Sequence, residues 1–210
     1  MEITPTSLPW NSLYKILVGS VVPRPIGWIS SIDAEGRANL APFSFFNVVC
    51  ANPPTVLFCP MIRGTDSSQK DTLGNVRASG EFVVNIVSED LAGAMNITST
   101  ELPASVDEFE AAGLEKAAST RVRPPGVAAS RIRFECKLSQ IHEISREPGG
   151  GSIVIGEVVH IHIDESVLVG EDKIDPAVLR PIGKLAGNAY CRVTDLFELV
   201  RPKSQLDLPK

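Results

Sequence analysis

The tripeptide Lys70-Asp71-Thr72 combines an ammonium, a carboxylate and a hydroxyl where a polar loop is predicted to enter a short helix. The first turn of a helix has backbone N–H groups with no partner inside the helix, and these favour an anion such as a phosphate. Lys70 and Thr72 therefore indicate an anion site. Asp71 would repel a phosphate at close range, so we expect it to cap the helix or orient Lys70. The same residues also fit a solvated helix start without a ligand.

A second candidate is the segment 39–47, which reads NLAPFSFFN. It interleaves three phenylalanines with a hydroxyl and two amides. Such a segment can line a flat aromatic ligand, and it can equally form core beside a polar turn.

A third candidate is the run His160, His162 and Asp164. Side chains alternate along a strand, so two imidazoles and a carboxylate share one face. A mononuclear metal site needs a third or fourth convergent ligand, and His142 is the one further histidine in the sequence. We therefore predict no metal, and expect a polar strand face near a cleft with one histidine lining a ligand site.

Composition and missing motifs exclude several classes of protein. The sequence has no G-x-G-x-x-G, no G-x-x-x-x-G-K-[ST] and no G-x-S-x-G, so Rossmann, P-loop and α/β-hydrolase folds have no support. A net charge of −5 argues against nucleic acid and anionic membranes as partners. No apolar run approaches the ~20 residues that span a bilayer, and no secretory signal is present. Four cysteines without a C-x-x-C pair predict reduced, structural thiols in a cytoplasmic protein.

Short strands must position these groups. The 210 residues are expected to form a single domain, 1–210, of mainly β structure. Strands are predicted at 25–31, 38–46, 55–60, 81–87, 131–145, 152–163 and 189–200. Short helices are predicted at 10–18, 71–79, 88–95 and 107–112. About seven strands with a few short helices favour an all-β barrel.

Seven segments together resemble one known family. They are RPIGWISS (24–31), NLAPFSFFN (39–47), NPP (52–54), KDT (70–72), EFVVNI (81–86), GEVVHIHI (156–163) and LAGNAY (185–190). Their order and spacing resemble those of the flavin reductase-like FMN-binding proteins, which include flavoredoxin. The resemblance covers nearly the whole chain.

The resemblance implies an FMN-binding split β-barrel that forms a homodimer, with one FMN per subunit near the subunit interface. It assigns cofactor contacts to four groups of residues. These are the strand beside the ribityl chain and phosphate (Trp28, Ile29, Ser30, Ser31), the wall around the isoalloxazine and ribityl groups (Ser44, Phe45, Phe46, Asn47), the phosphate grip (Lys70 and Thr72, with Asp71 between them) and a loop facing the cofactor from the same or the partner chain (Leu185, Ala186, Gly187, Tyr190).

The last of these segments departs from the family pattern. Lys184 and Ala186 stand where family members often carry arginine and a first glycine. A larger residue at a position of close approach alters how the loop can contact FMN.

The function implied is an oxidoreductase that passes electrons from NAD(P)H through FMN to free flavin, iron or another acceptor. His162 is placed like a histidine that borders the nicotinamide pocket in the family's reductases, although a packing role is the alternative. A flavoredoxin-like carrier that is reduced by a partner protein is the second interpretation. A heme- or F420-related binding module on the same barrel is the third.

Overall fold

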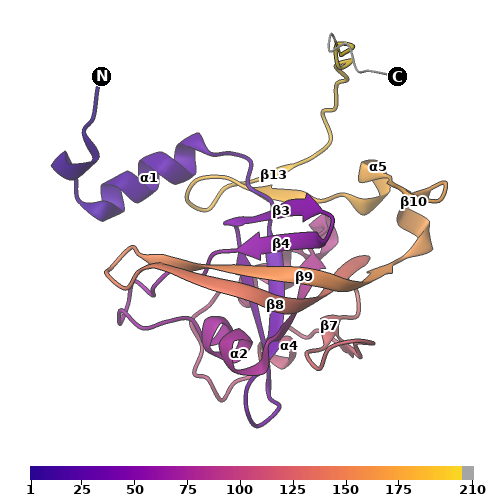
Figure 1. Ribbon diagram of the computed structural model, residues 1–210, viewed down its shortest axis with the longest axis horizontal. Helices are drawn as coiled ribbons and strands as arrows, with labels where there is room; N and C mark the ends of the chain where they lie inside the picture. The colour runs from indigo at the N-terminus through magenta and orange to yellow at the C-terminus, as the bar shows by residue number, and fades with distance from the viewer. Residues whose placement is uncertain (205–210) are drawn as a thin grey trace, which may run out of the picture.

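The computed structural model describes residues 1–204, and most of its ordered elements are strands (Figure 1). Seven antiparallel strands form one sheet in the order β2-β1-β5-β8-β9-β4-β3. Their bounds are β1 Gly27–Ile32, β2 Ala38–Phe43, β3 Phe46–Ala51, β4 Pro54–Phe58, β5 Glu81–Ile86, β8 Ile132–Ser145 and β9 Gly151–Ile163. In Figure 1 the long β8–β9 hairpin passes in front of β1 and β2, which lie at one edge of the strand order. The sheet therefore curves into a barrel.

Short helices and two-stranded ladders decorate this sheet. The helices are α1 Trp10–Ser20, α2 Asp71–Ser79, α3 Ala92–Ile97, α4 Glu108–Ala111 and α5 Pro176–Leu179, with 3₁₀ turns at Pro5–Ser7, Glu89–Leu91 and Glu165–Val167. The ladders pair β6 Lys116–Ala117 with β7 Gly126–Val127, β10 Leu168–Val169 with β11 Lys173–Ile174, and β12 Ile182–Lys184 with β13 Tyr190–Arg192. Within residues 1–204, no helix has the length and hydrophobicity needed to cross a membrane.

Strand β1 is buried on both of its faces. On the inner face, Ile29 packs with Phe82 and with Leu73 of α2, which fills one end of the barrel. On the outer face, Trp28 packs with Met95 of α3 and neighbouring side chains. Because neither face of β1 meets water, all of its residues are buried, and burial does not alternate along the strand.

Helix α2 begins and ends where the sequence predicts. It starts at Asp71 and is followed by Gly80, whose φ of +71° is a left-handed conformation that favours glycine. The first turn of α2 lies beside β2, because the Thr72 hydroxyl of that turn donates to the Asn39 side chain of β2.

Two of the predicted strands are wrong in extent. The predicted strand 38–46 ends at Phe43 as β2, and the separate strand β3, which begins at Phe46, was not predicted. The chain turns at Ser44, and the Phe46 ring packs 2.6 Å from where an ideal Cβ on Gly27 would lie. The predicted strand 189–200 is ordered as a strand only at β13, since residues 193–200 form no ladder with the described strands. These errors offset each other, so the main sheet still has seven strands.

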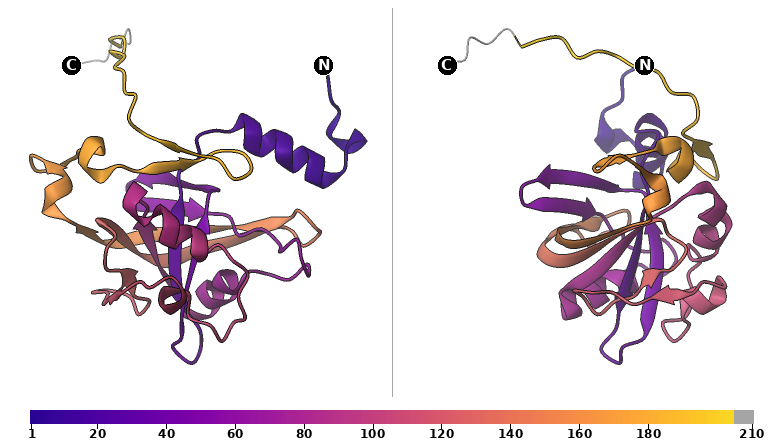
Figure 2. Two further views of the ribbon diagram at one scale, coloured as in Figure 1. Left: turned by 180° about the vertical axis from the view of Figure 1, so that it is seen from behind. Right: turned by 90° about the vertical axis from the view of Figure 1, so that its right-hand side faces the viewer.

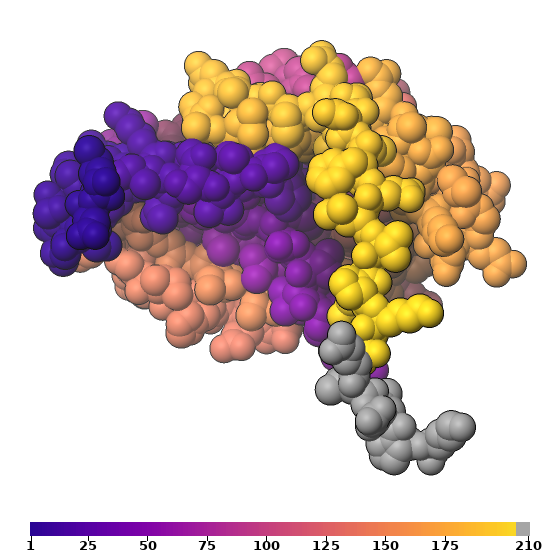
Figure 3. All heavy atoms as spheres, turned by 90° about the horizontal axis from the view of Figure 1, so that it is seen from above, coloured from indigo at the N-terminus to yellow at the C-terminus, as the bar shows by residue number. Residues whose placement is uncertain are grey.

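Helix α1 and the described residues after β13 lie on the same side of the sheet (Figures 2 and 3). Helix α1 buries only Val18 and leaves Leu17 61% exposed. The segment after β13 exposes Phe197 and Val200 almost completely. Exposed apolar side chains on this scale are typical of a surface that another protein covers.

Candidate functional site

A groove follows β2 and consists of two adjoining cavities of about 610 and 60 Å³. Pro42 and Ser99 line both cavities, so the larger one opens beside the smaller. We call this feature the β2 groove, its small cavity the α2 end and its large cavity the wide end. The larger volume lies within the ~300–1,000 Å³ typical of cofactor sites.

The α2 end brings together the residues of the predicted anion site. Lys70 and Thr72 line it with Arg63, which comes from the loop before α2. Asp71 forms an ion pair with Arg63 at 2.5 Å, and Lys70 lies 3.6 Å from Glu101. The expectation that Asp71 orients Lys70 or caps the helix is therefore wrong, since its carboxylate accepts from Arg63 and no side chain caps α2.

Arg63 carries an unsatisfied donor. Its Nε and the hydroxyl of Ser68 are the buried side-chain polar atoms without a hydrogen-bond partner within residues 1–204. A buried N–H without a partner costs about 1–3 kcal/mol, so an anion accepting from Nε would remove that cost. The sequence analysis missed Arg63, although a second cation in the same polar loop as Lys70 was the signal that could have found it.

A buried hydrogen-bond chain holds Thr72 in place. The Thr72 hydroxyl donates to Asn39 Oδ1 at 2.7 Å, and Asn39 Nδ2 donates to Glu108 Oε1 at 2.9 Å. The backbone N–H of Leu40 donates to the other oxygen of Glu108 at 3.0 Å. Burial raises the pKa of Glu108 above its ordinary value, against the lowering effect of these donors. Thr72 is therefore anchored to the floor of the groove.

The wide end is lined by residues distant in the sequence. Ser44 lines it with Asn188 of the loop between β12 and β13 and with Tyr190 at the start of β13, and α3 also contributes lining residues. The Lys184 ammonium lies 4.1 Å from the centre of the Tyr190 ring and donates to the carbonyl of Ala189 at 3.4 Å. Burial, with Arg24 nearby, lowers the pKa of Lys184.

The loop residues themselves show how the departure from the family pattern is accommodated. Gly187 adopts a φ of +56° and its carbonyl accepts from the Lys184 ammonium. Ala186 is exposed, while Leu185 is half-buried. The Lys184 ammonium thus holds the loop together through the carbonyls of Gly187 and Ala189. The loop therefore forms without a glycine at position 186.

Arg24 connects the parts of the wide end. Its side chain is nearly buried, and its guanidinium donates to the carbonyls of Val18 at 2.6 Å and Leu185 at 3.0 Å and to the Ser44 hydroxyl at 3.3 Å. It also lies over the ring of Phe45, 5.9 Å from the centroid. The sequence predicted only extended backbone here. Nothing in a single sequence indicates that one arginine joins α1, Ser44 and the 185–190 loop.

Four of the predicted cofactor residues lie behind the groove. The side chains of Trp28, Ile29, Ser30 and Ser31 are fully buried in β1. Trp28 Nε1 donates to the Thr98 hydroxyl at 2.8 Å, next to the shared wall residue Ser99. These residues shape the wall from beneath, and a direct contact with a cofactor remains a prediction.

The predicted aromatic wall is divided between the groove and the core. Ser44 lines the wide end, and Phe45 is half-buried beside Arg24. Phe46 is buried in the barrel core, and Asn47 is exposed on β3, where its side chain accepts from the N–H of Val48. Their predicted contacts with a cofactor remain predictions, and the geometry favours Ser44.

His162 lies at a different cavity. Its ring contacts the buried carboxylate of Glu135, and it lines an opening together with Arg131, Arg133 and Asp164. That opening has no lining residue in common with the β2 groove. Its role at a nicotinamide pocket therefore remains a prediction.

The chain thus folds as a β-barrel with a polar, cation-lined groove of cofactor size. The family model for the flavin reductase like domain matches residues 18–176. The chain therefore belongs to the flavin reductase-like family. Family membership makes it a flavin-binding oxidoreductase in general terms.

Solved structures agree with this assignment. The chain is similar to component B of nitrilotriacetate monooxygenase from Bacillus cereus, with 35% identity and a TM-score of 0.89 over 95% of this chain and 98% of that one. It is also similar to 2-nitrobenzoate 2-nitroreductase from Pseudomonas fluorescens, with 32% identity and a TM-score of 0.86 over 100% and 99%. A Shewanella frigidimarina protein described as a flavin reductase with a split barrel domain has 22% identity and a TM-score of 0.82 over 96% and 100%. The predicted split barrel is thereby confirmed.

Proposed function

We propose that the protein binds FMN in the β2 groove and passes electrons from NAD(P)H to free flavin, iron or another acceptor. The observation that carries the proposal is the groove itself, with an unsatisfied Arg63 donor at its narrow end and a cavity of about 610 Å³ at the other. A phosphate needs cationic hydrogen-bond donors, whereas a flat ring system needs a larger cavity. The α2 end offers the donors and the wide end offers the cavity.

The residues present fit such a cofactor. Arg63 and Lys70 would hold the phosphate. The Thr72 hydroxyl lies beside them and donates its proton to Asn39 Oδ1. Ser44 and Tyr190 would contact the ring system in the wide end. FMN, when bound, supplies the hydride chemistry, so the protein needs to provide grip, orientation and exclusion of water.

We expect the protein to bind the electron donor NAD(P)H weakly. The sequence has no Rossmann motif, so a nicotinamide would rest on the wall of the wide end and on loop contacts. We therefore expect a KM toward the upper part of the usual range of about 1 μM–1 mM. The flavoredoxin-like carrier remains the second candidate, because the same groove would serve a protein donor.

The deciding experiment is identification of the extracted cofactor followed by anaerobic mixing of the holoprotein with NADH and, separately, NADPH. Bleaching of the flavin absorbance by either nucleotide supports the reductase. A flavin that stays oxidised with both would favour the carrier that is reduced by a partner protein. Absence of any flavin after reconstitution with FMN would remove both.

We further propose that the protein is a homodimer and that residues 1–210 form one domain. The exposed apolar side chains of α1 and of the segment after β13 belong to elements on one side of the sheet, where a second copy would cover them. Sedimentation that shows a monomer with full FMN occupancy would contradict the dimer. A cytoplasmic location is the matching expectation, since all four cysteines are unpaired.

A further inference from the structure

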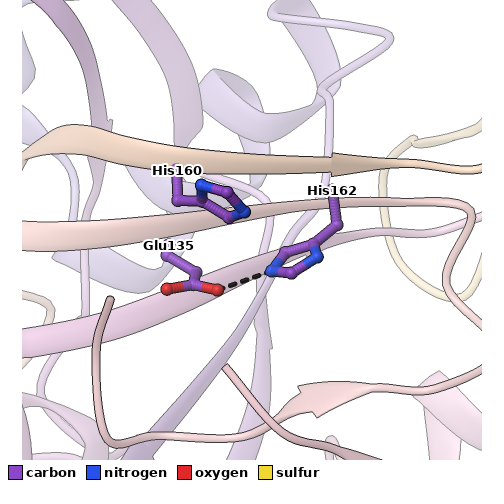
Figure 4. A group of neighbouring side chains, drawn as sticks. All are labelled: Glu135, His160 and His162. Carbon is purple, nitrogen blue, oxygen red and sulfur yellow. Dashed lines mark hydrogen bonds and ion pairs between the residues drawn. The ribbon is translucent and has the colours of Figure 1, made fainter. Parts of the chain in front are cut away.

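Glu135, His160 and His162 form a cluster on one face of the β8–β9 hairpin (Figure 4). The antiparallel register places Glu135 opposite His160, and His162 follows two residues later on the same face. The possible ligand atoms of the three residues all lie within 4.8 Å of one another. The sequence showed two histidines without a third ligand, and the neighbouring strand supplies the carboxylate.

The carboxylate of Glu135 is held rigidly. Its side chain is fully buried and accepts from the backbone N–H groups of Thr120 at 2.7 Å, Arg121 at 2.5 Å and Val122 at 3.2 Å. A buried, oriented anion of this kind requires a cationic partner.

Both imidazoles face this anion. His162 Nε2 lies 2.5 Å from Glu135 Oε1, and its side chain is 26% exposed. The His160 ring lies 4.7 Å from that of His162 and is also half-buried. No hydrogen bond is found for His160 within residues 1–204, so one ring nitrogen is free to bind an ion that enters from solvent.

These distances suit a first-row transition ion. Ligands at ~2.0–2.1 Å around a tetrahedral Zn²⁺ lie about 3.3 Å apart. The possible ligand atoms already lie within 4.8 Å of one another, and His162 Nε2 and Glu135 Oε1, now 2.5 Å apart, would separate by about 0.8 Å to bind the ion. Two imidazoles with one carboxylate form a donor set that zinc and other divalent transition metals prefer. Backbone donors to the carboxylate supply the outer contacts that such ligands need.

We propose that Glu135, His160 and His162 bind one divalent transition-metal ion, with Zn²⁺ as the best fit and water as the remaining ligand. Two arginines that line the same opening as His162 bind other groups. Arg131 pairs with Asp90 at 2.9 Å, and Arg133 donates to the carbonyl of Val127 at 3.4 Å. A bound ion would join β8 to β9 and, through Glu135, hold the 120–122 loop, which assigns it a structural role independent of the β2 groove.

The test is titration of the metal-stripped protein with Zn²⁺ alone, with stoichiometry measured by elemental analysis after dialysis. The full-length protein is expected to retain one Zn²⁺ per chain at micromolar concentration. His160→Ala should weaken Zn²⁺ binding by more than about 100-fold, because it removes one of three ligands. His142→Ala is the matched control, since His142 lies farther along β8 and should leave Zn²⁺ binding unchanged.

Further readouts keep the test independent of folding and of flavin. Co²⁺ should give visible d–d absorption in the full-length protein and in His142→Ala, but not in His160→Ala. Both variants should retain FMN binding, so a failed metal site and a failed flavin site give different results. Zn²⁺ binding that His160→Ala leaves unchanged, or retention below one ion per chain in the unsubstituted protein, would overturn the proposal and leave Glu135 and His162 as a hydrogen-bonded pair.

Discussion

The two ends of the β2 groove are built in different ways. The α2 end draws Arg63, Lys70 and Thr72 from ten consecutive positions, where a loop enters a helix. The wide end joins Ser44 to the loop after β12 through Arg24, whose contact with Leu185 spans 161 positions. Chemistry that lies in one stretch of chain is visible in the sequence. Chemistry that depends on a buried connector is not.

The two ends also differ in what their charges do. Arg63 and Lys70 are paired with carboxylates at the rim, and each keeps donors that a ligand can use. Arg24 donates its hydrogen bonds to protein carbonyls and to one hydroxyl, so its role is to hold the parts of the site together. Substitutions should therefore separate ligand contact at one end from structural support at the other.

The largest effect is expected for Arg24→Ala. The change leaves buried carbonyls of Val18 and Leu185 without donors, so the free energy of unfolding should fall by about 2–4 kcal/mol. Affinities for FMN and riboflavin should fall together, because both share the ring system. Urea denaturation and fluorescence titration measure the two effects. Arg37→Ala, at an exposed ion pair, is the control and should cost under about 1 kcal/mol.

Arg63→Ala is expected to have the next largest effect, and on FMN alone. The change removes a donor to the phosphate and also leaves Asp71 unpaired beside it, so FMN should bind about 100-fold more weakly. Riboflavin, which lacks the phosphate, should bind almost as before. Titration of both ligands checks this, with the exposed Arg77→Ala as control. A riboflavin loss as large as the FMN loss would show that Arg63 supports the fold of the groove.

Lys70→Ala should weaken FMN binding by roughly 10- to 100-fold, with little change for riboflavin. The effect should be smaller than that of Arg63→Ala, because Lys70 lies 3.6 Å from Glu101 in a looser and more exposed ion pair. Lys137→Ala, on the exposed face of β8, is the control for loss of one positive charge. Equal losses for FMN and riboflavin would place the phosphate elsewhere.

The smallest effect concerns the anchor of Thr72. The pKa of Glu108 is raised by burial, so the folded protein keeps a proton that the unfolded chain loses above about pH 4.3. This group's contribution to stability is therefore greatest below that pH and falls as pH rises through the raised pKa. The unfolding free energy of the unsubstituted protein minus that of Glu108→Gln should decrease between pH 4 and pH 7. A flat or rising difference would contradict the raised pKa.

The sequence by itself determined most of the local structure. Alternation and β-forming residues located the long hairpin strands, and Gly80 set the end of α2. The adjacency of Lys70 and Thr72 at a helix start was enough to predict an anion site, because helix geometry fixes how neighbouring residues point.

Only the tertiary structure decided which distant groups meet. The turn at Ser44 depends on Phe46 packing over Gly27, and the unsatisfied Nε of Arg63 depends on burial of its loop. The joining of Glu135 to two histidines depends on the register of β8 with β9. Propensity and periodicity act over a few residues. Register, burial and long-range hydrogen bonds are fixed only when the whole sheet closes around its core.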